Sequence, residues 1–196
     1  MKIKKITYFP IIILLGMFFL NSLFSNSQSL NDTYNVLKKV GKVELREYQP
    51  LLFVSYKNNY DIDNQNSSFR VLADYIFGAN ETQEKIAMTS PVVINLDNDR
   101  EMLFRMPKKY DRDNLPKPKN DDIKIITSKK IIKATIRYSG YTNEKKEYNM
   151  IKELKKVLSE NNIKHTNQFE LFVYDPPYKP FNRRNEISVN IIKSSN

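Results

Sequence analysis

Three prolines near the end of the chain, Pro176, Pro177 and Pro180, constrain its fold more than any other feature of the sequence. Each proline fixes one backbone angle and removes one amide donor, so this stretch is a stiff loop and not a strand or helix. Residues 169–174 before it and 186–191 after it alternate in the pattern typical of strands. The sequence therefore predicts two strands joined by a rigid turn.

This proline-rich loop carries cations and aromatic rings together, namely Lys179, Arg183 and Arg184 with Tyr178 and Phe181. Fixed cations beside aromatic faces suit a flat, partly apolar, anionic ligand. The same composition also fits a solvated hairpin tip with no ligand.

The first residues have the order of an export signal. Lysines at positions 2, 4 and 5 precede the apolar run 8–20, and a polar stretch follows to residue 29. The apolar run is shorter than the roughly 18 residues of a membrane-spanning helix. We expect residues 1–27 to be an export signal cleaved before Gln28, or else an uncleaved membrane anchor. Residues 28–196 then form one folded domain outside the cytoplasm, in the periplasm or the extracellular space.

Composition narrows the classes of partner. The chain has a formal net charge of +10, but its lysines are scattered in pairs, without any motif for nucleic acid. We therefore expect no nucleic-acid partner, whereas contact with a membrane surface or an anionic ligand remains open. The absence of cysteine excludes disulfides, thiolate metal sites and thiol catalysis.

The remaining pattern consists of two similar halves. The first is predicted to hold strands at 42–48 and 51–56, a helix with Phe69, Leu72, Ala73 and Ile76 on one face, and strands at 86–94 and 101–106. The second holds strands at 123–127 and 131–138, a helix at 144–160, and the two strands around the proline-rich loop. In that helix Ile151, Leu154 and Leu158 form the expected buried stripe, extended by Tyr148. Such duplicated ββαββ halves predict an α+β fold, a barrel-like antiparallel sheet with both helices outside.

Three motifs in order resemble those of the SOUL haem-binding protein family. Residues 69–80 and 85–92 are similar to the family's helix ending Y-I-x-G-x-N and its K-I-x-M-T-x-P-V segment, and residues 174–186 resemble its carboxy-terminal motif. Residues 103–107 and 138–141 fit between these motifs. The resemblance spans about residues 34–193. It implies a distorted eight-stranded antiparallel β-barrel with two flanking helices, built from a duplicated half.

The resemblance also implies non-covalent binding of haem or a related tetrapyrrole beside the first helix and the proline-rich loop. The binding residues it suggests are Lys179, Arg183, Arg184, Tyr178, Phe69 and Tyr75. The sequence departs from the family pattern at the helix, where Asn66 and Asp74 stand at basic positions. It also carries Glu47 where some members have a histidine that binds iron.

No other residue stands out as an iron ligand. His165 is the sole histidine and lies in a polar stretch, where an exposed, unliganded role is expected. The methionines at 88, 102, 106 and 150 have spacings typical of core residues. We therefore predict no metal site formed by the protein alone.

Two glutamates and a tyrosine near the proline-rich loop are candidates for a catalytic role. Glu186 or Glu170, with Tyr174, would supply a general base with aromatic walls. Glu186 is also adjacent to Arg183 and Arg184, so an ion pair that holds the loop is the favoured interpretation. No nucleophile, metal-ligand or phosphate-loop motif accompanies these residues, so we expect no enzyme.

Two functional hypotheses follow. The first is a monomeric tetrapyrrole-binding protein outside the cytoplasm, acting as carrier, buffer or scavenger. The second is an interaction domain that keeps the fold, has lost haem binding, and uses its basic surface on a membrane or protein partner.

Overall fold

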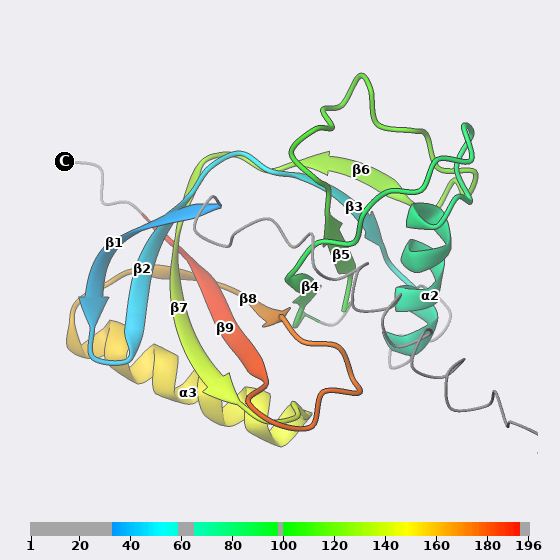
Figure 1. Cartoon of the computed structure of the whole chain (residues 1–196). Helices are drawn as coiled ribbons and strands as arrows, with labels where there is room; N and C mark the ends of the chain where they lie inside the picture. Colours follow the sequence, from blue (N-terminus) through cyan, green and yellow to red (C-terminus); the bar gives the residue numbers. More distant parts are fainter. Residues whose placement is uncertain (1–32, 59–64, 98–99, 193–196) are drawn as a thin grey trace, which may run out of the picture.

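A computed structural model describes residues 33–58, 65–97 and 100–192 of the chain. This part forms an α+β fold in which nine antiparallel strands make one sheet and two helices pack against it (Figure 1). The predicted export signal or anchor at 1–27 lies outside the described residues. Within the described part, neither helix is long and apolar enough to cross a membrane.

The two helices are α2 (Gln65–Ile76) and α3 (Glu144–Glu160). The strands are β1 (Tyr34–Val40), β2 (Val43–Tyr48), β3 (Leu52–Tyr56), β4 (Val92–Asn95), β5 (Met102–Arg105), β6 (Lys124–Thr127), β7 (Ile131–Ser139), β8 (His165–Val173) and β9 (Arg184–Ile191). In the sheet they follow the order β1-β2-β7-β9-β8-β4-β5-β3-β6.

The strand order agrees with the predicted duplication. The units β2-β3-α2-β4-β5 and β6-β7-α3-β8-β9 occupy equivalent places in the sheet. If each strand is exchanged for its counterpart in the other unit, the order from β2 to β6 is the same, read from the opposite end. The first strand of each unit pairs with the second strand of the other, β2 with β7 and β6 with β3. The two halves also meet in the middle, where β4 pairs with β8.

The predicted closure into an eight-stranded barrel is not confirmed. Among the described residues the sheet has nine strands and two ends, β1 and β6. Strands β1 and β2 form a hairpin that turns at Gly41. The hydrogen bonds of β1 occupy the outer edge of β2, so this edge is not available to β6. The sheet is therefore open.

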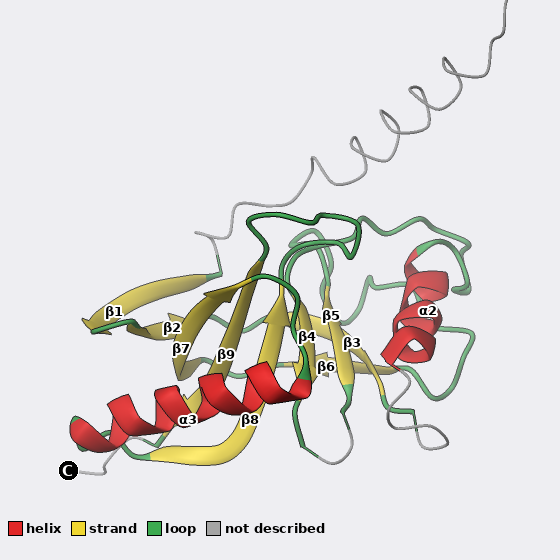
Figure 2. Cartoon of the chain, turned by 90° about the horizontal axis from the view of Figure 1, so that it is seen from below, coloured by secondary structure: helices red, strands yellow, loops and turns green. Residues whose placement is uncertain are grey.

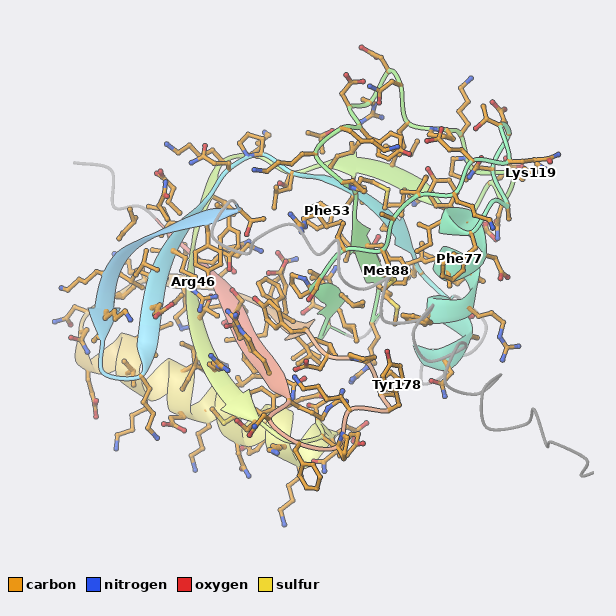
Figure 3. All side chains as sticks on the ribbon, viewed as in Figure 1. Arg46, Phe53, Phe77, Met88, Lys119 and Tyr178 are labelled. Carbon is orange, nitrogen blue, oxygen red and sulfur yellow. The ribbon has the colours of Figure 1, made fainter. Side chains whose placement is uncertain are left out.

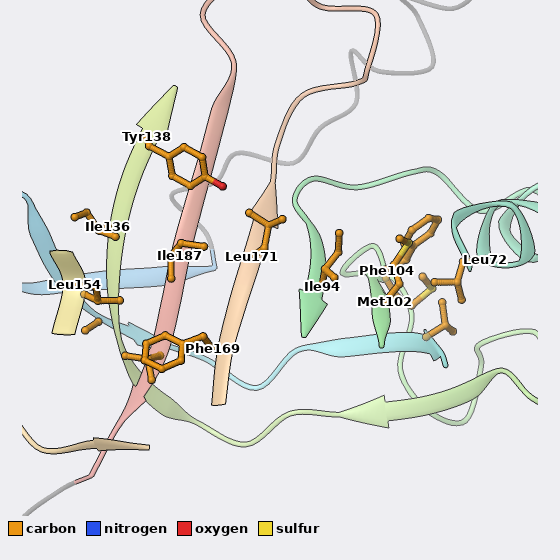
Figure 4. Packing of buried hydrophobic residues seen from close by; sticks show 14 of the residues in the cluster. Leu72, Ile94, Met102, Phe104, Ile136, Tyr138, Leu154, Phe169, Leu171 and Ile187 are labelled. Atoms are coloured by element: carbon orange, nitrogen blue, oxygen red, sulfur yellow. The ribbon is translucent and has the colours of Figure 1, made fainter. Parts of the chain in front are cut away.

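Alternation along the strands separates the sheet into two faces. On β9, Ile187 and Val189 point into the main core with the helices, whereas Glu186 and Ser188 point to the opposite face. The main core is continuous across both halves, from Leu154 of α3 to Leu72 of α2 (Figure 4). Figure 2 shows α3 lying along β7, β9 and β8, while α2 packs on the other half.

The bounds of α3 match the predicted 144–160, because local signals fix both ends. The Asn143 side chain accepts a hydrogen bond from the amide of Lys146 at 2.9 Å, the geometry of an N-cap. Leu154 and Leu158 are fully buried, as expected. The prediction that Tyr148 extends the buried stripe was wrong, because its side chain is 67% exposed. The preceding residue, Glu147, is buried.

The first helix and the strand after it differ from the prediction in detail. Gly78 follows α2 with φ of 119°, a conformation that glycine adopts readily, and so fits its expected role at the helix end. The expected strand at 86–94 begins only at Val92, after Pro91, and residues 86–91 run as an irregular connection. Proline cannot donate to a sheet ladder, which accounts for this late start.

The contrast between Leu154 and Tyr148 gives a test of the α3 interface. We expect Leu154→Ala to lower the free energy of unfolding by about 2–5 kcal/mol, because it removes fully buried methyl groups and leaves a cavity. Tyr148→Ala on the same helix should change it by no more than about 0.5 kcal/mol. Urea unfolding followed by circular dichroism measures both values. Equal effects of the two substitutions would contradict the burial of this face.

Candidate functional site

The proline-rich loop, residues 174–183 between β8 and β9, is held by Asp175 at its start. One carboxylate oxygen accepts a hydrogen bond from Lys179 Nζ at 2.5 Å, and the other accepts from the backbone amide of Arg184 at 2.6 Å. Burial alone would raise the pKa of Asp175, but the bonds from Lys179 and Arg184 outweigh it and lower the pKa. Asp175 is therefore charged at neutral pH and fixes the loop at both ends.

Arg183 braces the same loop from inside. Its guanidinium donates to the backbone carbonyls of Pro176 at 2.5 Å, Lys179 at 3.1 Å and Asp175 at 3.1 Å. It also lies 4.5 Å from the centre of the Tyr141 ring, and the residue is only 6% exposed. Arg183 thus orders the loop and presents little of its charge to an external ligand.

Below the loop, Glu186 is a fully buried carboxylate. Its oxygens accept five hydrogen bonds, two from Arg46 (2.7 and 3.1 Å), two from Arg184 (3.0 and 2.7 Å) and one from the Tyr174 hydroxyl (2.7 Å). Arg46 points into the interior from β2 (Figure 3), with its guanidinium 4.4 Å from the Tyr34 ring centre. Charge-assisted, bidentate bonds of this kind are the strong ones in proteins.

The protonation of Glu186 follows from these partners. Burial would raise its pKa, but the hydrogen bonds and charges of Arg46 and Arg184 outweigh burial and lower the pKa. A carboxylate with a lowered pKa is a weak base, and the oxygens of Glu186 are already occupied. The predicted ion pair with Arg184 is confirmed, whereas Arg183 takes no part and Arg46 was not foreseen.

A short segment, residues 86–91, connects α2 to the base of the proline-rich loop. The amide of Ile86 donates to the carbonyl of Ile76 at the end of α2 at 2.8 Å, and Ser90 Oγ donates to the carbonyl of Tyr174 at 3.1 Å. Between them Thr89 Oγ1 donates to the carbonyl of Arg105 on β5 at 2.6 Å. Helix and loop are thereby fixed relative to each other.

Exposed aromatic side chains lie on both of these elements. Phe69 (40% exposed) lies on α2 and Phe77 (57%) directly follows it, while Tyr178 (62%) and Phe181 (78%) lie on the loop. They are four of the nine large apolar residues that are exposed in the described part of the chain. Half-buried Met88, labelled in Figure 3, lies on the connection between these two elements. We call these five residues, Phe69, Phe77, Met88, Tyr178 and Phe181, the helix–loop surface.

The residues suggested for binding are thus divided. Phe69 and Tyr178 lie on the helix–loop surface, and the Lys179 side chain is 42% exposed beside it, paired with Asp175. Tyr75 is fully buried, and its hydroxyl donates to the Pro116 carbonyl at 2.7 Å, so it faces the core and not a ligand. Arg184 is engaged with Glu186. Phe77, which sequence reasoning passed over, stands out only through its exposure.

Side chains weighed as iron ligands lie elsewhere or in the core. Glu47 pairs with Lys130 at 3.0 Å on β2. His165 was expected to be exposed but is half-buried in β8, 5.9 Å from the Phe169 ring centre. Met102 and Met106 are buried as predicted, and Met88 and Met150 are half-buried against the core. The described residues contain no group of three or more acidic or histidine side chains able to hold a metal ion.

The face of the sheet away from the helices carries a separate groove of about 230 Å³. Every strand of the described sheet contributes a side chain to its lining. These are Tyr34, Tyr48, Phe53, Val93, Leu103, Ile126, Lys133, Phe172 and Asn190, in the order β1 to β9. None of the residues of the helix–loop surface lines this groove.

Known proteins with similar sequences carry a consistent description. The family model described as SOUL heme-binding protein matches residues 31–190. Heme-binding protein 1 of Xenopus tropicalis is 31% identical over 155 residues, which cover 74% of this chain and 80% of that protein.

Solved structures share the fold at low sequence identity. An uncharacterized conserved protein from Listeria innocua matches with a TM-score of 0.59 and 10% identity, over 77% of this chain and 92% of that one. A hydrolase from the same organism matches with a TM-score of 0.56 and 9% identity, over 80% and 94%. At such identities these likenesses concern the fold alone.

The buried carboxylate under the loop is testable by its effect on stability. Glu186→Gln should lower the free energy of unfolding at pH 7 by about 3–5 kcal/mol, because it removes the buried carboxylate that pairs with both Arg46 and Arg184 and leaves Arg46 with only its partly exposed partner Glu44. The pKa of Glu186 in the folded protein lies below the ordinary 4.5, so its contribution is complete above about pH 4.5 and is lost as the pH falls through the folded value. The difference between the parent and Glu186→Gln should therefore shrink in acid.

Glu153→Gln is the matched control, because Glu153 pairs with Lys42 at 3.1 Å on the surface. Its cost should not exceed about 1 kcal/mol. Denaturant unfolding at pH 7, 5 and 3 measures both variants. A difference for Glu186→Gln that stays constant or grows in acid would contradict the lowered pKa.

Proposed function

Because this chain belongs to the SOUL heme-binding protein family, we propose that it binds haem or a related tetrapyrrole non-covalently at the helix–loop surface. The observation that carries this proposal is the exposure of Phe69, Phe77, Tyr178 and Phe181 on two elements that residues 86–91 hold together. Exposed apolar surface of this kind, when it is extensive, marks ligand-binding or interaction sites.

The chemistry of this surface fits a porphyrin. A porphyrin is a flat apolar disc that carries carboxylates, so it requires apolar contact and a nearby cation. The aromatic rings and Met88 supply the contact, and Lys179 is the loop cation with a substantially exposed side chain. Arg70 on α2 and Lys85 on the connection after it are also exposed, whereas Asn66 and Asp74 stand where the family has cations.

The haem group would supply its iron chemistry, and the protein's part is to hold it. Among the residues of the helix–loop surface Met88 has the one thioether, while Glu47 is engaged on β2 by Lys130. A haem that is held only by apolar contact and by pairing of its carboxylates with Lys179 is readily released. Such binding suits a carrier, buffer or scavenger better than an enzyme.

The amino-terminal sequence supports a place of action outside the cytoplasm. The order of lysines, apolar run and polar stretch in residues 1–29 supports export, with the domain secreted or held by an uncleaved anchor. We propose that a monomer outside the cytoplasm carries or buffers the tetrapyrrole. Its positive net charge would also favour contact with an anionic membrane surface.

One observation favours the second candidate, an interaction domain without haem. Asp74 is exposed on α2 and repels the carboxylates of a porphyrin. In that case the aromatic side chains of the helix–loop surface would contact a protein or membrane partner instead. Haem titration separates the two candidates, because the interaction domain should show only non-saturable adsorption.

The test is a haemin titration of the purified full-length protein, followed by absorbance. We expect one-to-one saturation, and a Kd at least about tenfold higher in Tyr178→Ala/Phe181→Ala, which corresponds to roughly 1.4 kcal/mol of lost contact. The control Val36→Ala/Tyr148→Ala removes two exposed apolar side chains elsewhere and should bind like the parent. Absence of saturation in the parent would exclude haem binding. Equal Kd values for the two double variants would move the site away from the loop.

The role of charge is tested separately by Lys179→Ala. We expect a Kd about three- to tenfold higher, with a weaker dependence on salt, because one exposed cation is lost. Lys152→Ala, which removes an exposed lysine from α3, is the matched control. A salt dependence identical in parent and Lys179→Ala would exclude pairing between Lys179 and the ligand.

A further inference from the structure

The groove on the face of the sheet away from the helices is not used by the proposed function. We propose that it takes a small apolar carboxylate, a molecule with one anionic group and a short aliphatic or aromatic body. The groove measures about 230 Å³, below the roughly 300–1,000 Å³ of pockets for drug-sized ligands, so it is too small for a tetrapyrrole. It is thus distinct from the helix–loop surface in residues and in size.

The walls of the groove explain the apolar body of the ligand. Phe53, Val93, Leu103 and Phe172 form a second apolar cluster, separate from the main core that the helices cover. These four side chains come from strands β3, β4, β5 and β8 and therefore from both halves of the duplicated sheet. Apolar walls that meet around a hollow gain free energy when an apolar ligand displaces water from it.

The charges of the groove explain the anionic group. Its lining contains the cations Arg105, Lys129 and Lys133 and the single carboxylate of Glu170. Lys133 and Glu170 form an ion pair with each other, so they neutralise their own charges. Lys129, which is exposed, then gives the mouth of the groove a positive charge, which favours a carboxylate over an ammonium group.

The two remaining cations differ in position. Arg105 is 3% exposed and donates to the carbonyl of Ser90 at 3.2 Å, so its guanidinium is fixed in the wall. Lys129 is exposed at the rim, between β6 and β7. A carboxylate at the rim would approach Lys129 with its charge partly in water, while its apolar body reaches the cluster of Phe53 and Phe172. This arrangement avoids burying an unpaired charge, which would be costly.

Two probes of equal length and opposite charge test this inference. Decanoate and decylammonium are titrated separately into the full-length protein by calorimetry, below the concentrations at which they form micelles. We expect saturable binding of decanoate, at least tenfold tighter than that of decylammonium. Equal affinities would show that the groove does not select charge, and tighter binding of decylammonium would reverse the assignment. Either result, like the absence of saturable binding, overturns the proposal.

Lys129→Glu tests whether the carboxylate of decanoate lies beside Lys129. It should weaken decanoate binding about three- to tenfold and strengthen decylammonium binding. Lys130→Glu makes the same change of charge one residue further, outside the groove lining, and should alter either affinity by less than about twofold. Equal effects of the two variants would mean that the affinity for decanoate depends only on the net charge of the protein and not on this groove.

Val93→Trp fills the groove and tests the apolar end. Its circular dichroism spectrum and its haemin titration should match the parent, which shows that the domain folds, while decanoate binding should fall at least tenfold. If Val93→Trp does not fold, the Lys129→Glu and Lys130→Glu pair still decides. Haemin added to saturation should not displace decanoate. Displacement would mean that both ligands use one site, and would overturn the second site even if haem binding holds.

Discussion

The buried carboxylate of Glu186 is the interaction on which the arrangement of this domain depends. A fully buried charge is tolerated only when it is paired and hydrogen-bonded, and Glu186 draws its partners from β2, from the start of the proline-rich loop and from its own strand. Arg46 ties β2 to β9, and the Tyr174 hydroxyl ties the start of the proline-rich loop to the same carboxylate. The loop is thus fixed by a network in the interior of the protein, and not by its prolines alone.

Sequence reasoning succeeded where the signals were local. The bounds of α3, its Leu154 and Leu158 stripe and the strands on either side of the proline-rich loop follow from periodicity and capping within a few residues. It failed for Arg46, which lies 140 residues from Glu186 and meets it only because β2 pairs with β7 and β7 with β9. Barrel closure failed for a related reason, since no pattern in the sequence showed that β1 would occupy the outer edge of β2.

The burial of Tyr75 also depends on a contact that is distant in the sequence. The family resemblance suggested Tyr75 as a binding residue, but the loop that contains Pro116 covers it on α2. The carbonyl of Pro116 satisfies the Tyr75 hydroxyl, and only that long-range contact allows a polar atom to be buried there. Phe69 and Phe77 then remain as the exposed rings of this segment, which shifts the candidate site toward its outer side.

The loop cations show why residue type alone does not define a binding site. Asp175 accepts from Lys179, and Arg183 and Arg184 donate to the loop backbone and to Glu186, so three cations in the sequence present only one substantially exposed charge. A ligand at the helix–loop surface would then gain most of its affinity from contact with aromatic rings. Contact of this kind is roughly proportional to buried area and not directional, so it holds a flat ligand without fixing its orientation. Release requires no rearrangement of the buried network, which is the property expected of a carrier.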